Sequence, residues 1–191
     1  MPGDTGPVLG AAFGETLADA QAGDQDAFAA IFRDVQPPLL RYLQVIAANA
    51  GDDIAGDTWL QVIAGLARFR GDERAFRAWV FTIARHRAID IGRSLARRKT
   101  LLLRLGETDG RQVTPDAADV ALEQLSTRAV LAAISSLPAD QAEIIMLRVV
   151  AGLDAPSVAA LVGKTPGAVR VAAHRGLRRL ATQIDRTGVT V

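Results

Sequence analysis

Apolar residues recur every three or four positions along most of this chain, which is the spacing of one face of an α-helix. Alanine and leucine are frequent among them, and the strict apolar/polar alternation of a half-buried β-strand is not sustained. We therefore expect an all-α protein. In the first half, the pattern predicts five helices, at Glu15–Ala22, Asp26–Asp34, Pro37–Ala50, Asp52–Arg68 and Glu73–Arg98.

The helical pattern lapses between residues 100 and 118, where glycine, proline, threonine and aspartate interrupt the apolar repeat. This mildly acidic stretch predicts a flexible linker. We therefore expect two small helical domains at residues 16–99 and 119–186, with a disordered N-terminus at 1–15 and a frayed tail at 187–191.

The second domain begins with two predicted helices, from about Asp116 to Ser136 and from Ala139 to Val150. They are separated at Pro138, because the residue before a proline avoids the helical conformation.

The stretch from Asp154 to Leu180 has the pattern of a helix-turn-helix. Asp154 is a good N-cap, Gly163 suits a turn with positive φ, and Thr165 can cap the second helix. Helical spacing places an apolar side of each helix inward. The inward residues are Val158, Ala159, Leu161 and Val162 in the first helix, and Val169, Ala172, Ala173, Leu177 and Leu180 in the second.

The opposite face of the second helix is basic. The same spacing places Lys164, Arg170, His174 and Arg178 outward. Short residues and cations at the start of a helix are what the major groove of DNA accommodates. The alternative is plain antiparallel packing of two helices around a glycine turn.

Composition narrows the class of protein further. The 191 residues contain no cysteine, so neither a disulfide framework nor a thiolate metal site is available, and a reducing cytoplasm is the compartment we expect. The two histidines, His86 and His174, are too few and too far apart to indicate a metal, and we expect no cofactor. The chain lacks an apolar run long enough to span a membrane and a basic start typical of a signal peptide.

The formal net charge of +1 conceals a strong asymmetry along the chain. Acidic residues dominate up to Leu60, whereas arginine dominates from Arg68 to Lys99 and again from Lys164 to Arg186. Two separate basic helices, each beside an apolar framework, indicate two contacts with one polyanion. Solvated helix faces are the alternative for either cluster alone.

Motifs in both halves of the chain stand in an order that is similar to one protein family. In the first half they are Asp53–Leu60, Phe69-Arg70 and Phe76–Asp90; in the second they are Leu137-Pro138, Ile144–Arg148, Gly152-Leu153, Val158-Ala159, Gly163 and Thr165–Arg170. In this order and spacing they resemble region 2 and region 4 of bacterial sigma factors of the extracytoplasmic-function group, over residues 24–99 and 123–181.

The resemblance implies a sigma factor that binds core RNA polymerase and directs promoter-specific initiation. The helix that begins at Asp52 resembles the segment that docks on the coiled coil of the β′ subunit. Its polar contacts would be Asp53, Asp57 and Gln61, with Trp59 or Val62 supporting the helix. The family usually has a glutamine where this chain has Gly56. The alternative is that the carboxylates only cap and solvate a helix.

The long basic helix resembles the reader of the minus-10 promoter element, taken as a melted single strand. Single-strand binding needs cations along the backbone and flat groups for unstacked bases. His86 and Asp90, one turn apart, could contact base edges or could simply pair with each other. Phe76 and Trp79 are better explained as core residues. The matching positions are Arg70, Phe81, Arg85, His86, Asp90 and Arg93.

The helix-turn-helix, by the same resemblance, would read the minus-35 element as duplex DNA. Arg170 and His174 would face the bases, and the later arginines would hold phosphates. The resemblance also implies the β subunit and an anti-sigma factor as partners. The full set of contact residues is Lys164, Thr165, Gly167, Arg170, His174, Arg175, Arg178 and Arg179.

Three rival functions remain open from the sequence. An enzyme is disfavoured, because the chain has no glycine-rich phosphate loop and no nucleophile-base set. A stand-alone helix-turn-helix regulator would bind duplex DNA without polymerase, but its first domain would carry a ligand pocket or receiver sheet. An adaptor would use its two domains to clamp a protein.

Overall fold

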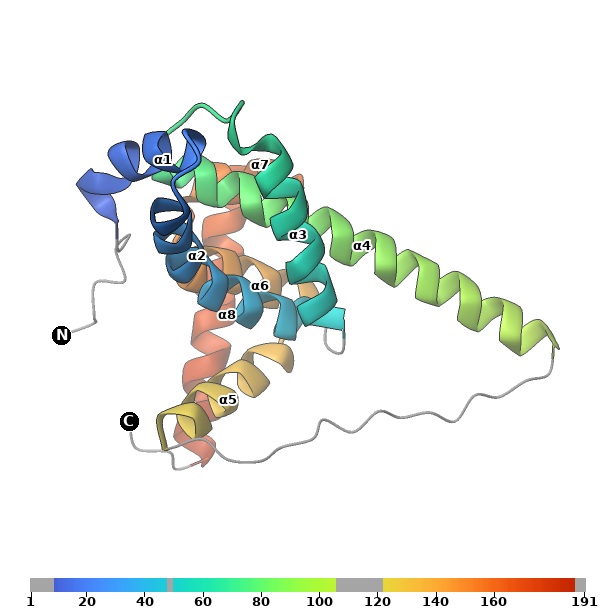
Figure 1. Ribbon diagram of the computed structural model, residues 1–191. Helices are drawn as coiled ribbons and strands as arrows, with labels where there is room; N and C mark the ends of the chain where they lie inside the picture. Colours follow the sequence, from blue (N-terminus) through green and yellow to red (C-terminus); the bar gives the residue numbers. More distant parts are fainter. Residues whose placement is uncertain (1–8, 48–49, 106–121, 188–191) are drawn as a thin grey trace.

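The computed structural model describes residues 9–47, 50–105 and 122–187, and every regular element within these ranges is helical (Figure 1). The prediction of an all-α fold is confirmed. The predictions for residues 1–8, 106–121 and 188–191 lie outside the described residues, whereas residues 10–15, which the sequence placed in a disordered N-terminus, are helical. The elements are η1 (Gly10–Ala12), α1 (Phe13–Gln21), α2 (Gln25–Ile46), α3 (Gly51–Leu66), α4 (Glu73–Leu105), α5 (Leu122–Ser135), α6 (Ala139–Ile145), the π-helical turn η3 (Met146–Val150), α7 (Ala155–Val162) and α8 (Pro166–Thr187).

Helix α2 is continuous through Pro37 and Pro38, where the sequence predicted a break between two helices. A proline inside a helix removes a backbone hydrogen bond and costs about 3 kcal/mol. The helix continues because it buries large side chains on both sides of the prolines, including Ile31 and Val35 before them and Tyr42 after them. Packing therefore overrides the local preference.

Helix α4 also differs from its predicted bounds. It runs to Leu105, beyond the predicted end at Arg98, so residues 100–105 are helical although the sequence placed them in a linker. Its second half projects away from the body of the molecule (Figure 1).

Helices α1 to α4 enclose an aromatic core. Phe76 is fully buried, and its ring lies 5.6 Å from that of Phe13, between centroids. Phe69 stacks on Trp79 with centroids 5.1 Å apart. Phe76 is thus a core residue and Trp79 packs at the edge of the same cluster, as the sequence indicated.

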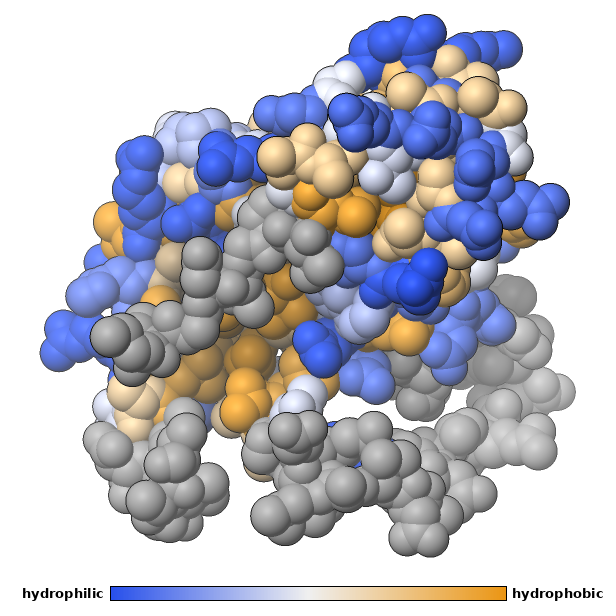
Figure 2. Space-filling view, turned by 60° about the vertical axis from the view of Figure 1, so that its left-hand side comes forward, coloured by the Kyte–Doolittle hydropathy of each residue, from blue (hydrophilic) through white to orange (hydrophobic). Residues whose placement is uncertain are grey.

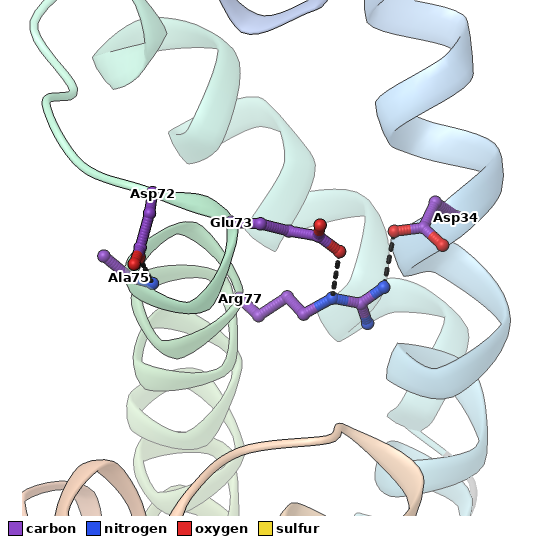
Figure 3. Close-up of polar contacts among 5 residues, drawn as sticks. All are labelled: Asp34, Asp72, Glu73, Ala75 and Arg77. Carbon is purple, nitrogen blue, oxygen red and sulfur yellow. Dashed lines mark hydrogen bonds and ion pairs between the residues drawn. The ribbon is translucent and has the colours of Figure 1, made fainter. Parts of the chain in front are cut away.

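A buried ion cluster joins α2 to the start of α4 (Figure 3). The Arg77 guanidinium donates to Asp34 on α2 and, at 3.1 Å, to Glu73 one turn earlier in its own helix. Asp72 caps α4 by accepting from the backbone N–H of Ala75 at 2.8 Å. Asp34 Oδ1 and Glu73 Oε2 are buried without a donor among the described residues, so both carboxylates rely on this one guanidinium.

The helix-turn-helix has the local geometry that the sequence predicted. The Asp154 carboxylate accepts from the N–H of Ser157 at 2.8 Å, and hydrogen bonding to Ser157 lowers the pKa of Asp154. Gly163 adopts a left-handed conformation with φ of 70°, and the Thr165 hydroxyl accepts from the N–H of Ala168 at 3.2 Å. One residue in this motif was assigned to the wrong side: Leu177 is 47% exposed.

Gly176, next to Leu177, makes the close contact in its place. A Cβ atom at Gly176 would lie 2.5 Å from Cδ1 of Ile145 in α6, so the absence of a side chain is what lets the two helices approach here. Leu177 lies to one side of this contact line, which explains its exposure.

The two halves of the chain pack against each other. Helix α2 contacts α5, α6 and η3 of the second half, and α4 contacts α7. The sequence predicted two domains on a flexible linker and gave no sign of this interface. The structure therefore shows a closed arrangement in which α2 lies between the two helical groups (Figure 1).

Hydrophilic side chains cover most of the described upper part of the face seen in Figure 2, and apolar colour is concentrated in the recess below it. Among the described helices, none combines the length and the apolar character that a membrane crossing requires.

The ion cluster yields a stability prediction. We expect Arg77→Met to lower the free energy of unfolding by about 3–5 kcal/mol, because it leaves two buried carboxylates without a counter-charge. Urea unfolding followed by circular dichroism measures this change. The matched control is Arg33→Met on the exposed α2 surface, where Arg33 donates to the Ala29 carbonyl of its own helix; it should change stability by less than about 0.5 kcal/mol. Equal effects of the two substitutions would contradict the assignment.

Candidate nucleic-acid interface

The outward face of α8 presents the predicted cations to solvent. Gly167, Arg170, His174, Arg175 and Arg178 are all exposed. The contacts of α8 with α6 and α7 hold its other side, which keeps this face turned outward.

Two residues at the start of this motif have structural contacts as well. Lys164 Nζ lies 3.3 Å from Asp140 Oδ2 of α6, and the Thr165 hydroxyl serves as the N-cap of α8. Both remain exposed. Their structural bonds therefore leave them at the surface beside the basic face.

Arg179 is turned toward α6. It donates to Gln141 Oε1 at 2.9 Å. A guanidinium carries five N–H donors, so this bond leaves capacity for a phosphate. An open cleft of about 480 Å³ lies beside it, lined by Ser136, Leu137, Pro138, Arg178, Arg179, Thr182 and Gln183.

Sequence reasoning missed Val171 on the same face. It is 49% exposed and lies between Arg170 and the next turn of the helix. At 100° per residue, Gly167, Val171, His174 and Arg178 fall within one narrow stripe. The same helical spacing that identified the cations could have found this valine.

The basic face of α4 carries three of the predicted minus-10 residues in exposed positions: His86, Asp90 and Arg93. Asp90 lies 3.9 Å from Arg93 Nη1, and this is its ion pair rather than one with His86. A cleft of about 290 Å³ runs between α3 and α4 and brings together Gln61, Ile83, His86, Arg87 and Asp90.

Arg70, a fourth predicted residue, closes the end of α3. Its Nη1 donates to the carbonyls of Ala67 at 3.0 Å and Phe69 at 2.6 Å. The side chain is exposed, so it satisfies helix-end carbonyls while standing at the surface.

Phe81 and Arg85 are the last two predicted minus-10 residues; Phe81 packs in the core against α2, and Arg85 is bonded to the second half of the chain. Phe81 is fully buried, with the Tyr42 ring 5.4 Å away between centroids. Arg85 Nε donates to Glu143 Oε1 of α6 at 2.8 Å, and the Tyr42 hydroxyl donates to the same oxygen at 3.1 Å. In this arrangement neither residue is free for DNA, and their role stays a prediction.

Burial raises the pKa of Tyr42 far above the ordinary phenol value, and the Glu143 carboxylate raises it further. The phenol therefore stays protonated and remains a donor to Glu143 at any physiological pH.

Helix α3 presents an acidic and apolar outer face, which we define as Asp53, Gly56, Asp57, Leu60 and Ile63. All five are exposed, Leu60 at 68% and Ile63 at 53%. Ile63 is apolar, yet the structure places it outward rather than in the core. Large exposed apolar side chains beside carboxylates are typical of a protein contact.

Two other α3 residues were named for docking, Trp59 as a support of the helix and Gln61 as a polar contact. Trp59 is 5% exposed, and its indole N–H donates to Gln36 Oε1 at 2.6 Å, so it supports α3 from inside and makes no surface contact. Gln61 is exposed, but its side-chain oxygen accepts from Arg87 at 3.4 Å, which turns it toward α4.

Comparison with known proteins gives a consistent result. The model of sigma-70 region 2 matches residues 31–99, and that of sigma-70 region 4 matches residues 127–180. The chain is 36% identical to the ECF RNA polymerase sigma factor SigD of Mycobacterium tuberculosis over 180 residues, which covers 90% of this chain and 84% of SigD. It is 33% identical to the ECF sigma factor ShbA of Streptomyces griseus, covering 94% of this chain and 97% of ShbA.

Two solved structures share the fold. One is the sigma factor RpoE of Bartonella quintana in complex with the anti-sigma factor NepR, with a TM-score of 0.60, 23% identity, and coverage of 86% of this chain and 98% of that one. The other is CnrH in complex with the cytosolic domain of CnrY, with a TM-score of 0.59, 22% identity, and coverage of 90% and 96%.

Proposed function

This chain belongs to the extracytoplasmic-function group of sigma factors, and we propose that it brings core RNA polymerase to promoters through three surfaces, on α3, α4 and α8. The observation that carries the proposal is that both matched regions expose a basic helix face, while α3 exposes a separate acidic and apolar one. Such a chain would work in the cytoplasm, where polymerase and promoter DNA meet.

The α3 outer face is the proposed contact with the coiled coil of the polymerase β′ subunit. Asp53 and Asp57 supply charge, and Leu60 and Ile63 supply apolar area that docking would remove from water. Gly56 lies within this face, and a Cβ there would meet nothing within 4 Å. The position is therefore open for a partner side chain.

The basic face of α4 is the proposed reader of the melted minus-10 strand. The cleft beside His86 and Asp90 offers an imidazole, a carboxylate and the Gln61 amide, which are groups that can bond to base edges. Arg93 follows Asp90 by three residues on α4, and Arg70 lies in the loop before α4. Both would hold phosphates. Arg85 would join this surface once the second half moves away, whereas Phe81 would support it from the core.

The outward face of α8 is the proposed reader of the minus-35 duplex. A helix-turn-helix places its second helix in the major groove with the early residues at the base edges. Arg170 and His174 occupy that part of α8. Arg175, Arg178 and Arg179 follow later along the helix and would bind phosphates, with the β subunit as the neighbouring protein in the assembled enzyme.

An anti-sigma factor is a further proposed partner. Both structural relatives were solved with a second protein, NepR with RpoE and CnrY with CnrH. A partner of this kind would cover the α3 or α4 surfaces and keep the chain from polymerase.

The alternative, a stand-alone duplex-binding regulator, predicts no need for polymerase. Run-off transcription with purified core polymerase separates the two. The proposal expects a promoter-specific transcript that appears only when this chain is added, with start sites mapped by sequencing. Intact duplex binding without any transcript would favour the regulator.

Docking on α3 gives one prediction. We expect Leu60→Ala to weaken binding to core polymerase about 10-fold or more, because burial of a leucine side chain contributes about 1.5–3 kcal/mol. A fluorescence titration of labelled chain with core enzyme measures it. The control is Leu177→Ala, an exposed leucine on α8 (47%) outside the α3 outer face. If both variants bind core polymerase like the wild type, the α3 assignment is wrong.

The proposed reading of bases by α8 gives a second prediction. We expect Arg170→Ala to lose preference for the cognate minus-35 duplex over a scrambled one, because a bidentate base contact contributes about 1–3 kcal/mol of discrimination. Arg179→Ala should weaken binding to both duplexes alike and lower the salt dependence. Competition binding at several salt concentrations measures both. Equal losses on the two duplexes for Arg170→Ala would contradict its role.

A further inference from the structure

Val171 is an apolar side chain in the centre of a basic surface. It is 49% exposed, while Val169, two residues earlier on the same helix, is fully buried. Exposed cations flank it at Arg170 and Arg175. The interior of the protein therefore does not explain why an apolar residue stands at this position.

The helical position of Val171 limits what it can touch. It shares a stripe of α8 with Gly167 and His174, one turn to either side. Gly167 has no side chain, so the surface beside Val171 is open toward the start of the helix. A major-groove partner seated on this stripe would meet the two methyl groups of the valine directly.

The major groove offers one apolar group that such a residue fits. Thymine carries a C5-methyl group at its edge, whereas the other bases present hydrogen-bond donors and acceptors there. A β-branched side chain in a helix is held in one rotamer, so its methyl groups are already ordered before contact.

We propose that Val171 is a specificity-determining residue that packs against the C5-methyl group of a thymine in the minus-35 element. This rests on the proposed reading of duplex DNA by α8. It adds to the proposed hydrogen bonds of Arg170 and His174 a position at which the protein prefers thymine.

The test removes the methyl group and nothing else. In a minus-35 duplex from a mapped promoter, each thymine on either strand is replaced in turn by deoxyuridine. We expect one replacement to weaken binding of the wild-type chain about three- to ten-fold, the size of effect expected for burying about one methyl group. Val171→Ala should bind the thymine duplex more weakly by a similar factor and should be insensitive to that replacement.

The matched control is Val130→Ala, the same substitution at a valine of α5 that is also 49% exposed. It should keep the wild-type response to deoxyuridine. If no replacement affects the wild-type chain, or if Val171→Ala remains as sensitive as wild type, the Val171 contact is wrong. Failure of the wild-type chain to bind the unmodified duplex would instead contradict the minus-35 function.

A second, independent observation concerns Glu143. This carboxylate on α6 accepts from Arg85 on α4 and from Tyr42 on α2, so it bonds to two helices of the first half. The Arg85 and Glu143 side chains are 20% and 16% exposed, which leaves their ion pair within reach of water.

In the closed arrangement the two proposed DNA-binding surfaces are too close together to reach both promoter elements at once. Minus-10 and minus-35 elements lie about 25 base pairs apart, which is about 85 Å of duplex at 3.4 Å per pair. In the closed chain, α6 bonds to Arg85 through Glu143 and to Arg179 of α8 through Gln141 at 2.9 Å. Side-chain reach and the helix rise of 1.5 Å per residue then put Arg85 within about 45 Å of Arg170.

We infer that Glu143 locks the free chain in a closed state that withholds Arg85 from the melted strand. Opening must separate α6 from α2 and α4 before both elements can be bound together. Polymerase and the DNA phosphates compete for the same guanidinium.

Binding of a single-stranded minus-10 oligonucleotide to the full chain tests the lock. Glu143→Gln keeps the shape and removes the charge, and we expect it to bind the strand at least about five-fold more tightly, the lower end of usual coupling between sites. Tyr42→Phe should shift binding in the same direction by a smaller factor. The control Asp140→Asn removes a charge from the same helix without touching Arg85 and should bind like wild type.

Circular dichroism confirms that each variant is folded. Equal strand binding by wild type and folded Glu143→Gln, or weaker binding by the variant, would overturn the lock.

Discussion

The contact of Glu143 with Arg85 and Tyr42 decides which surfaces of this protein are available. The Glu143 carboxylate joins α6 to α2 and α4. It thereby holds the half that contains the helix-turn-helix against α4, the helix proposed to read melted DNA. Burial raises the pKa of Tyr42, so its hydroxyl stays protonated as a donor in this contact. The contact responds to competition for Arg85, and phosphates and protein carboxylates are the competitors that transcription brings.

Arg77, a second arginine on α4, differs from Arg85 in how deeply its ion pairs are buried. Arg77 lies between Asp34 and Glu73 with a side chain that is 11% exposed, and its removal would leave two buried charges. Removing one partner of such a buried pair is strongly destabilising. Arg85, two turns further along, makes the same kind of bond at a more open site and to the other half of the chain. The Arg77 ion pairs stabilise the first half of the chain, whereas the Arg85–Glu143 pair can be replaced by a contact with a partner.

Local signals in the sequence were sufficient for much of this structure. The N-cap at Asp154, the turn at Gly163 and the cap at Thr165 each depend on neighbouring residues, and all three are in place. The exposed cations of α8 followed from the same helical spacing. Local chemistry therefore predicted the helix-turn-helix and the position of its basic face.

The remaining features depend on contacts between distant residues. The bond of Arg85 to Glu143 joins positions 58 residues apart, and no local pattern marks it. The continuous α2 through Pro37 and the outward position of Ile63 depend on which helices pack on each side. No local pattern marks Gly176 either, and only its close approach to Ile145 shows why a side chain is absent there.

A distance measured across the interface tests the account most directly. The chain has no cysteine, so cysteines introduced at the exposed Ser94 of α4 and Thr182 of α8 can carry a pair of spin labels specifically. We predict one narrow, short distance distribution in the free chain and a shift to distances longer by tens of ångströms when core polymerase and promoter DNA are added. An unchanged distribution in the promoter complex, or a long and broad distribution in the free chain, would contradict the closed state.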